Sequence, residues 1–224
     1  GRDRLWRERV GGAALIGRHL LASGAQLESF VNVSSTAIYG SGLDPYIHTE
    51  ASPVGSGFLA SLYVGGEEEA YLLEAEALAK RWVSLRMGEV LCGYGGVLPY
   101  MAVGGNYGLA LLCGIGQQLV PWVHVSDAMR SIWLAIENRE MRGVYNVVAP
   151  EWVSYREIAT LSAQMRSGRS LPLPIPRGVW RAAVGAWGGP LMHSQRVASE
   201  RIEELGFDYL YPDISGALQH IYGE

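Results

Sequence analysis

Lysine is nearly absent from this 224-residue sequence, which holds 17 arginines but only one lysine, Lys80. The arginines are scattered along the chain, and the formal net charge at pH 7 is −4. Proteins that bind a nucleic-acid backbone carry clustered Lys and Arg on one face or along one helix. Since no such cluster is visible, we expect no nucleic-acid partner.

Cysteine is also scarce. Cys92 and Cys113 lie far apart and lack the spacing of zinc ligands or of a disulfide framework. We therefore expect two free thiols that pack as small hydrophobic side chains, and no metal site. A reducing compartment follows, either the cytoplasm or an organelle matrix, and the sequence does not choose between them.

Long apolar runs and targeting segments are missing too. No uninterrupted apolar stretch reaches the ~18 residues of a membrane span, and residues 104–113 are short and glycine-rich. We therefore do not expect an integral membrane protein. The chain shows no signal peptide and does not begin with Met, so we expect that its natural start has been removed or left out.

The residues that are present favour one globular α/β domain with a small cap. Hydrophobic residues make up 49% of the chain, enough for a core. Short apolar, β-branched runs predict buried parallel strands, and apolar residues at helical spacing predict helices between them. The predicted strands cover residues 30–33, 82–86 and 143–148, and the predicted helices cover residues 4–22, 67–81, 97–103, about 126–138, 154 onward and 179–184.

Two helix starts carry local signals. Ser126 or Asp127 is placed to cap the helix that runs to about Asn138. Ser154 is followed three residues later by Glu157, the spacing of a capping box. Residues 40–57 are rich in Gly, Pro, Ser and Asp, which predicts a loop.

A hydroxyl cluster follows the first predicted strand. Ser34, Ser35 and Thr36 come directly after the apolar residues at 30–33 and precede a Tyr39-Gly40 turn. Open parallel sheets bind their ligands beyond the carboxyl ends of the strands. This stretch is therefore the first candidate for a functional site.

An ordered series of phrases resembles one atypical branch of the extended short-chain dehydrogenases/reductases, the epimerase family proteins, which are NAD-dependent epimerase/dehydratase-like. The phrases are residues 33–40 (VSSTAIYG), 58–60 (FLA), 85–91 (LRMGEVL), 114–118 (GIGQQ), 122–127 (WVHVSD), 143–150 (GVYNVVAP), 194–197 (SQRV) and 206–207 (GF). The resemblance implies a Rossmann-like parallel sheet that binds NAD or NADP. Residues 1–150 would form a partial Rossmann-like domain, and residues 151–224 would form a C-terminal cap to which residues 97–121 contribute.

The resemblance also implies site residues. Ser35 falls on the family's catalytic serine, and Tyr39 follows it as a second catalytic candidate. Ser34 belongs to the same hydroxyl cluster and is assigned to cofactor binding. Arg86, Gly88 and Val90 lie where the family places its nicotinamide, and they complete the cofactor-binding set.

Two departures from the family limit the function. The glycine-rich dinucleotide fingerprint between the first strand and helix is absent, which corresponds to roughly two missing βαβ units of ~30 residues each. Residues 55–60 match G-x-G-x-x-A, but they follow a loop and not a strand. The proton donor Tyr-x-x-x-Lys is also absent, because Glu76 stands four residues before the only lysine. The corresponding place holds Phe58 and Leu62.

Structural roles compete with each functional assignment. Ser35 would serve equally well by satisfying backbone groups at a strand end, and Tyr39 by packing at a turn. For Arg86 we favour a buried ion pair with Glu89 or another carboxylate. His124 fits a structural histidine bonded to backbone, and Asp127 fits a helix cap.

Gln117 and Gln118 fit either a ligand-binding loop or a solvated one.

Two functions remain for the whole chain. In the first, it is the larger part of an NAD(P)-dependent oxidoreductase or epimerase whose N-terminal half-sheet lies outside this sequence, so that this chain alone binds no cofactor. In the second, it is a non-catalytic scaffold or accessory subunit whose exposed sheet edge other protein subunits cover.

Overall fold

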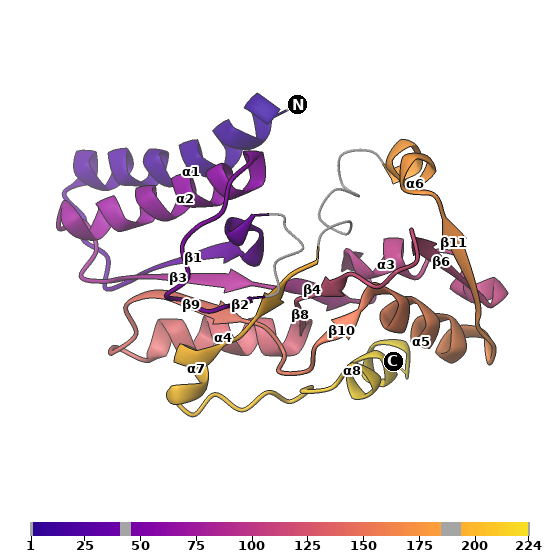
Figure 1. The fold of residues 1–224 in the computed structure, drawn as a ribbon. Coiled ribbons are helices and arrows are strands. Elements are labelled where there is room, and N and C mark those ends of the chain that lie inside the picture. Colours follow the sequence, from indigo (N-terminus) through magenta and orange to yellow (C-terminus); the bar gives the residue numbers. More distant parts are fainter. Residues whose placement is uncertain (1, 41–45, 185–193, 224) are drawn as a thin grey trace.

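A computed structural model describes residues 2–40, 46–184 and 194–223. At its centre lies a parallel three-stranded sheet in the order β1-β3-β9 (Figure 1). Its strands are β1 (Phe30–Ser35), β3 (Trp82–Met87) and β9 (Gly143–Val147). The prediction that these three segments share one parallel sheet is confirmed, and the α/β, Rossmann-like class with it.

Helices cover both faces of this sheet. Helices α1 (Arg2–Ser23) and α2 (Phe58–Ala75) pack against each other on one face, and α4 (Val125–Glu137) lies on the other (Figure 1). Most residues of β3 and β9 are buried, and apolar side chains predominate among them. The core between the sheet and α4 contains Val83, Leu85, Met87, Val123, Ala128, Ala135, Met141, Tyr145, Val147, Ile202 and Phe207.

Helix α2 corrects the predicted helix at residues 67–81, because it begins at Phe58 and ends at Ala75. Acidic residues stabilise the first turn of a helix, so the run of Glu at residues 67–69 has the composition of a helix start. Glu67 instead lies in the middle of α2 and is buried on the side that faces the sheet. A buried carboxylate needs a cationic partner, which sequence spacing did not reveal.

Shorter elements connect the sheet to the C-terminal region. Strand β4 (Glu89–Cys92) pairs with β8 (Trp122–His124) and β5 (Gly95–Gly96), and 3-10 helix η1 (Thr36–Tyr39) follows β1. The remaining short pairs are β2 (Ile47–His48) with β12 (Arg196–Val197) and β7 (Leu119–Val120) with β10 (Val153–Ser154). Residues 41–45 of the predicted 40–57 loop lie outside the described residues.

A second core lies in the C-terminal region, around the parallel pair β6 (Leu109–Cys113) and β11 (Leu171–Ile175). Helices α3 (Leu98–Met101), α5 (Tyr155–Ser167), α6 (Arg177–Val184) and α8 (Ile214–Gly223) and the 3-10 helix η2 (Gly105–Tyr107) surround it. Strand β11 holds Pro172 and Pro174, which suits an edge strand, and β6 is its strand partner among the described residues. Helix α3 is shorter than the predicted helix at 97–103.

The last part of the chain returns to the parallel sheet. Helix α7 (Glu200–Glu204) packs against β9, and Ser199 Oγ accepts a hydrogen bond from Val148 N at 2.8 Å.

The predicted division of the chain into two regions at residue 150 stays a prediction. No helix in the described ranges is long and apolar enough to cross a membrane. Cys92 and Cys113 are free thiols, and only Cys113 is fully buried.

The two predicted caps have different outcomes. Ser154 and Glu157 form the predicted capping box, with Glu157 N donating to Ser154 Oγ at 3.2 Å and Ser154 N donating to Glu157 Oε2 at 2.7 Å. The cap of α4 was misplaced, because His124 holds that position and its Nδ1 accepts from Ser126 N at 3.0 Å. His124 therefore has the structural, backbone-bonded role that we favoured.

Candidate functional site

The carboxyl end of β1 presents the hydroxyl cluster at the edge of the sheet. Ser35 is the N-cap of η1, and its Oγ accepts a hydrogen bond from Ala37 N at 3.1 Å. Ser34 is buried, and its Oγ has no hydrogen-bond partner among the described residues. Buried hydroxyls are normally paired, so Ser34 is a group that a ligand could satisfy.

Arg86 organises a buried polar network behind this edge. Its Nε donates to Glu67 Oε1 at 2.9 Å and its Nη2 donates to Glu67 Oε2 at 2.7 Å. Its Nη1 donates to the Tyr39 hydroxyl at 3.1 Å. The expected buried ion pair of Arg86 is therefore present, with Glu67 as the carboxylate and not Glu89.

The network extends to both neighbouring strands. Ser84 donates to Glu67 Oε1 at 3.1 Å and accepts from Asn32 Nδ2 at 3.0 Å. On the other side, the Tyr39 hydroxyl donates to Asn146 Oδ1 at 2.7 Å. Each group is thus held by its neighbours, and the network ties β1, β3, β9, α2 and η1 together.

Burial and hydrogen bonding together determine the protonation of this network. It raises the pKa of the Tyr39 phenol, and the hydrogen bonds with Arg86 and Asn146 oppose that shift without cancelling it. For Arg86, burial alone would lower the pKa, but the hydrogen bonds and the charge of Glu67 outweigh it and raise the pKa. At neutral pH the network therefore holds a neutral Tyr39 and a charged Arg86.

Gly88 and Glu89 continue from β3 at the same edge. Gly88 is buried, and a Cβ at this position would lie 2.8 Å from the carbonyl carbon of Pro121. The close approach of Pro121 is therefore a packing reason for the glycine. Burial raises the pKa of the Glu89 carboxyl. Val90 lies one residue further, on β4, and packs against the core between the sheet and α4.

The structure brings most of the predicted site residues together. In the β1-β3 register Ser34 is opposite Arg86, and Ser35 is opposite Met87, the residue before Gly88. Tyr39 is linked to Arg86 by a hydrogen bond. Val90 is on a different strand pair, opposite Val123. The catalytic and cofactor-binding roles of these residues stay predictions.

Sequence reasoning missed Glu67 and Asn146 as members of the network. Asn146 gave a usable signal, because it is a polar residue within an apolar, β-branched strand. Glu67 gave a weaker one, as an acid on the apolar face of a helix. Its partner Arg86 was singled out, but pairing across 19 residues is decided by how α2 packs on β3.

The structure corrects the role expected of Asp127 and excludes one of the two roles left open for Gln118. Asp127 was expected to cap α4, but it is fully buried and accepts hydrogen bonds from the amides of Leu210 and Tyr211, at 2.9 and 3.0 Å. It therefore anchors the chain after α7. Gln118 is not part of a solvated loop, because its side chain is buried and its backbone carbonyl accepts a hydrogen bond from Tyr155 N at 2.9 Å. Gln117 is exposed.

Comparison with known proteins agrees with this geometry. Residues 2–148 match the family described as "NAD dependent epimerase/dehydratase family", and residues 175–221 match a domain of unknown function, DUF1731. The human epimerase family protein SDR39U1 is 32% identical over 196 residues, which are 87% of this chain and 65% of that protein. The epimerase family protein ML0860 of Mycobacterium leprae is 29% identical over 197 residues, 88% of this chain and 63% of that protein.

Solved structures resemble the whole fold. The crystal structure of human SDR39U1 isoform 2 with NADPH has a TM-score of 0.89 and 27% identity, and the match covers 100% of this chain and 75% of that one. The nucleoside-diphosphate sugar epimerase of Corynebacterium glutamicum has a TM-score of 0.78 and 26% identity, with 99% and 43% covered. This chain thus spans less than two thirds of the length of the curated relatives described above. Because the family match extends over more than half of its residues, the chain belongs to the NAD-dependent epimerase/dehydratase family.

Proposed function

We propose that this chain is the nicotinamide- and substrate-facing part of an NAD(P)-dependent oxidoreductase or epimerase-like protein. The observation that carries the proposal is the hydroxyl cluster at the carboxyl end of β1, where Ser34 Oγ is buried without a partner among the described residues. Ligands of open parallel sheets bind at this edge. Family membership and the NADPH bound to the human relative support the same cofactor class.

The residues at the edge fit the nicotinamide end of such a cofactor. Ser34 offers a hydroxyl to a carboxamide. When bound, the cofactor would supply hydride transfer. The fingerprint that holds the pyrophosphate does not occur in this sequence, so another segment must provide it.

A surface for that segment is available. Strand β1 is the outer strand of the three-stranded sheet, next to β3. On α4, which contacts β1, the side chains of Met129, Trp133 and Ile136 form an exposed apolar stripe. An outer strand and an exposed apolar stripe together suit one more parallel strand and its helix. The greater length of the curated relatives is consistent with such a segment.

The chain's own residues would orient the substrate. In the proposal, Ser35 hydrogen-bonds a substrate hydroxyl or carbonyl, and water or Tyr39 supplies the proton. The Tyr39 proton is directed at Asn146 Oδ1, so that hydrogen bond must open before Tyr39 can donate to a substrate. The family's Tyr-x-x-x-Lys is replaced by Phe58 and Leu62 at the start of α2, which removes a proton donor of the kind worth about 10² to 10⁴ in rate.

Calorimetric titration with NADPH tests the proposal. This chain alone should bind NADPH more weakly than about 1 mM, and the protein that includes the segment encoded upstream should bind it at micromolar concentration. In that longer protein, Ser34→Ala should weaken binding about tenfold without lowering stability, because no hydrogen bond between described residues is lost. Ser23→Ala, at the exposed end of α1, is the matched control and should bind normally.

Three outcomes count against the proposal. They are micromolar binding by this chain alone, unchanged binding after Ser34→Ala, and a start codon directly before Gly1 in the gene. The last outcome, or a longer protein that does not bind NADPH, favours the scaffold. For the assigned role of Ser35, Ser35→Ala should remove turnover by the longer protein while its circular dichroism spectrum stays native.

A further inference from the structure

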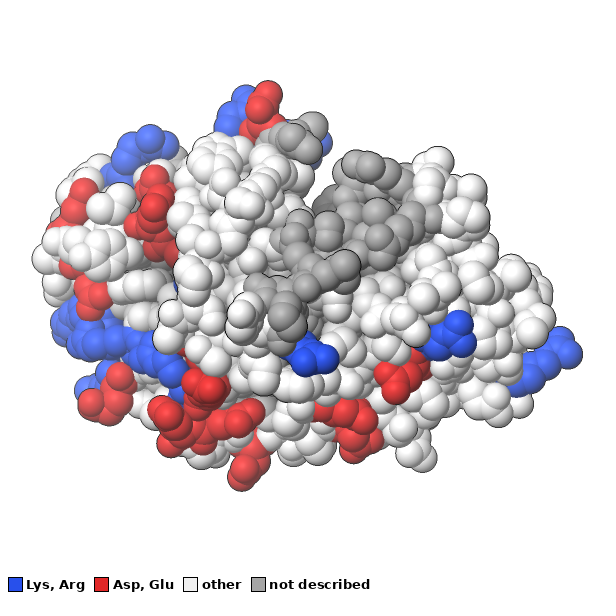
Figure 2. Space-filling model, in the orientation of Figure 1, with Lys and Arg blue, Asp and Glu red and all other residues white. Residues whose placement is uncertain are grey.

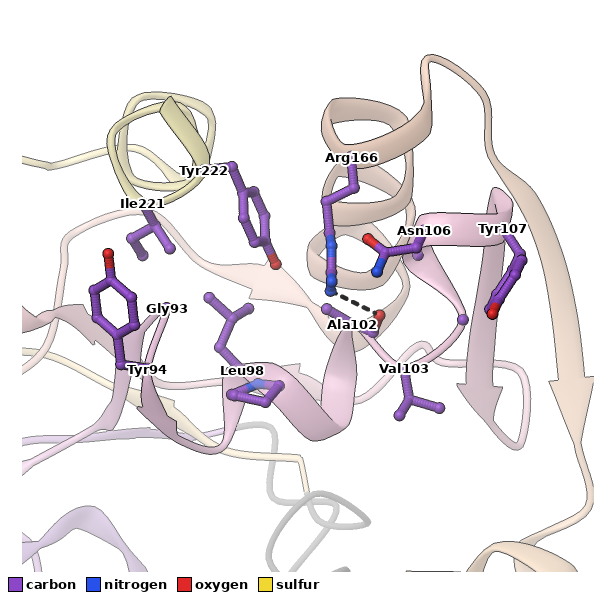
Figure 3. Close-up of a pocket in the computed structure, with 13 residues that line it drawn as sticks. Gly93, Tyr94, Leu98, Ala102, Val103, Asn106, Tyr107, Arg166, Ile221 and Tyr222 are labelled. Atoms are coloured by element: carbon purple, nitrogen blue, oxygen red, sulfur yellow. Dashed lines mark hydrogen bonds between the residues drawn. The ribbon is translucent and has the colours of Figure 1, made fainter. Parts of the chain in front are cut away.

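A cavity of about 420 Å³ lies in the C-terminal region (Figure 3). Its walls come from the turn after β4, from α3 and η2, and from α5 and α8. None of its lining residues belongs to β1, β3 or β9, so the cavity is separate from the sheet edge. Its volume lies in the range of small-molecule sites.

Arg166, near the end of α5, supplies the only charged side chain among the residues that line the cavity. Its Nη1 donates to the Ala102 carbonyl at 3.4 Å, which uses one of the five N–H groups of a guanidinium. No carboxylate of the described residues forms an ion pair with Arg166. The cavity is therefore positively charged and has hydrogen-bond donors to offer an anion.

An aromatic ring accompanies this charge. The Arg166 guanidinium lies 5.6 Å from the centre of the Tyr222 ring, and Figure 3 shows the two side chains extending side by side towards α3. Leu98 and Ile221 add apolar surface next to Tyr222. A planar guanidinium can bind a carboxylate through two parallel N–H groups, and it also stacks on aromatic faces.

Two glycines allow side chains of the cavity wall to pack closely against the backbone. A Cβ on Gly105 would lie 3.3 Å from Arg166 Cδ, and a Cβ on Gly93 would lie 3.2 Å from Ile221 Cγ2. Larger residues at these positions would push Arg166 and Ile221 away from their present places. The shape of the cavity therefore depends on the glycines as well as on the side chains that face the ligand.

We propose that this cavity binds a small aromatic carboxylate. Its carboxylate pairs with the Arg166 guanidinium, and its ring packs against Tyr222 and the apolar wall beside it. A site for a compact anion would not need the ring, and a site for a neutral ring would not need the unpaired guanidinium. The inference does not depend on cofactor binding at the sheet edge.

Benzoate is the probe for this site. In an NMR titration of the isotope-labelled protein, benzoate should shift the backbone amide signals of Gly93, Gly105 and Tyr222. The dissociation constant should be about 0.1 to 10 mM, which is within the ligand-efficiency limits for so small a molecule. Benzamide lacks the charge and acetate lacks the ring, so each should bind at least about tenfold more weakly. Addition of NADPH should not displace benzoate.

Variants separate recognition from folding. Arg166→Gln should weaken benzoate binding about tenfold to a hundredfold, because a charge-assisted hydrogen bond is lost. Tyr222→Leu should weaken benzoate binding less than Arg166→Gln does. The benzoate affinity of Arg166→Lys should lie between those of Arg166→Gln and the wild type. Arg169→Gln, just beyond α5 and outside the cavity lining, is the matched control. Thermal melting of each variant shows whether it is folded.

The proposal is wrong if benzoate and benzamide bind equally well or if neither produces a shift. It is also wrong if the shifts fall on the residues at the carboxyl end of β1, or if a folded Arg166→Gln variant binds benzoate like the wild type.

Discussion

Arg86 and Glu67 form a buried ion pair in which the guanidinium donates to both carboxylate oxygens, at 2.9 and 2.7 Å. Only 7% and 9% of the two side chains is exposed. The pair fastens α2 to β3 and, through Tyr39, fixes the turn that follows β1. The same contact therefore maintains both the fold and the edge that we assign to the cofactor.

Removal of one partner of this pair should be costly. Glu67→Ala should lower the free energy of unfolding by about 3 to 5 kcal/mol, because it leaves Arg86 charged and buried without a counter-ion. The partly exposed pair Glu74–Arg142 provides the control, and Glu74→Ala should lower the free energy of unfolding by less than about 1 kcal/mol. Urea denaturation measures both values, and equal losses would contradict the assigned burial.

The hydroxyl of Tyr39 should contribute on its own. Tyr39→Phe removes the acceptor of Arg86 Nη1 and the donor to Asn146 Oδ1, which should lower stability by about 1 to 3 kcal/mol. Tyr94→Phe is the control, because Tyr94 is 90% exposed and its replacement should leave the stability almost unchanged. Thermal unfolding followed by circular dichroism compares the two. A Tyr39→Phe variant as stable as the Tyr94→Phe variant would show that the network does not need this hydroxyl.

Glu89 should make stability depend on pH. Burial raises the pKa of its carboxyl, so the folded state binds the proton more tightly than the unfolded state. The resulting stabilisation is complete below the ordinary value of 4.5 and is lost as the pH rises through the raised pKa. Glu89→Gln should therefore be more stable than the wild type at pH 7 and differ little from it at pH 4.

Denaturation curves at both pH values measure this difference. Glu76→Gln, just after the end of α2, is the control and should show no comparable change between the two pH values. A constant difference between Glu89→Gln and the wild type from pH 4 to pH 7 would contradict the assigned effect of burial.

Two glycines should respond in opposite directions to alanine. A Cβ on Gly88 would lie 2.8 Å from the Pro121 backbone, so Gly88→Ala should destabilise the protein by about 1 to 3 kcal/mol. Gly66 lies inside α2 with nothing within 4 Å of its Cβ position, so Gly66→Ala should stabilise by about 0.5 to 1 kcal/mol. Differential scanning calorimetry measures both, and the same sign for both would be unexpected.

Several features were predictable because neighbouring residues determine them. The three strands follow from short β-branched runs, and α1 follows from apolar residues at helical spacing. Ser154 and Glu157 bond each other across one helical turn, so their spacing was enough to predict the cap. The hydroxyl cluster was found in the same way, because it follows directly after a strand.

The α/β class, the main strands, the family resemblance and the lack of both the fingerprint and the Tyr-x-x-x-Lys pair could all be read from the order of the residues. The partner of Arg86, the burial of Asp127, the link between Tyr39 and Asn146 and the cavity at Arg166 became visible only in the folded chain. These contacts join residues that lie far apart in the sequence. Tyr39 and Asn146 are 107 residues apart, and their hydrogen bond forms only because strand order and helix packing bring η1 next to β9.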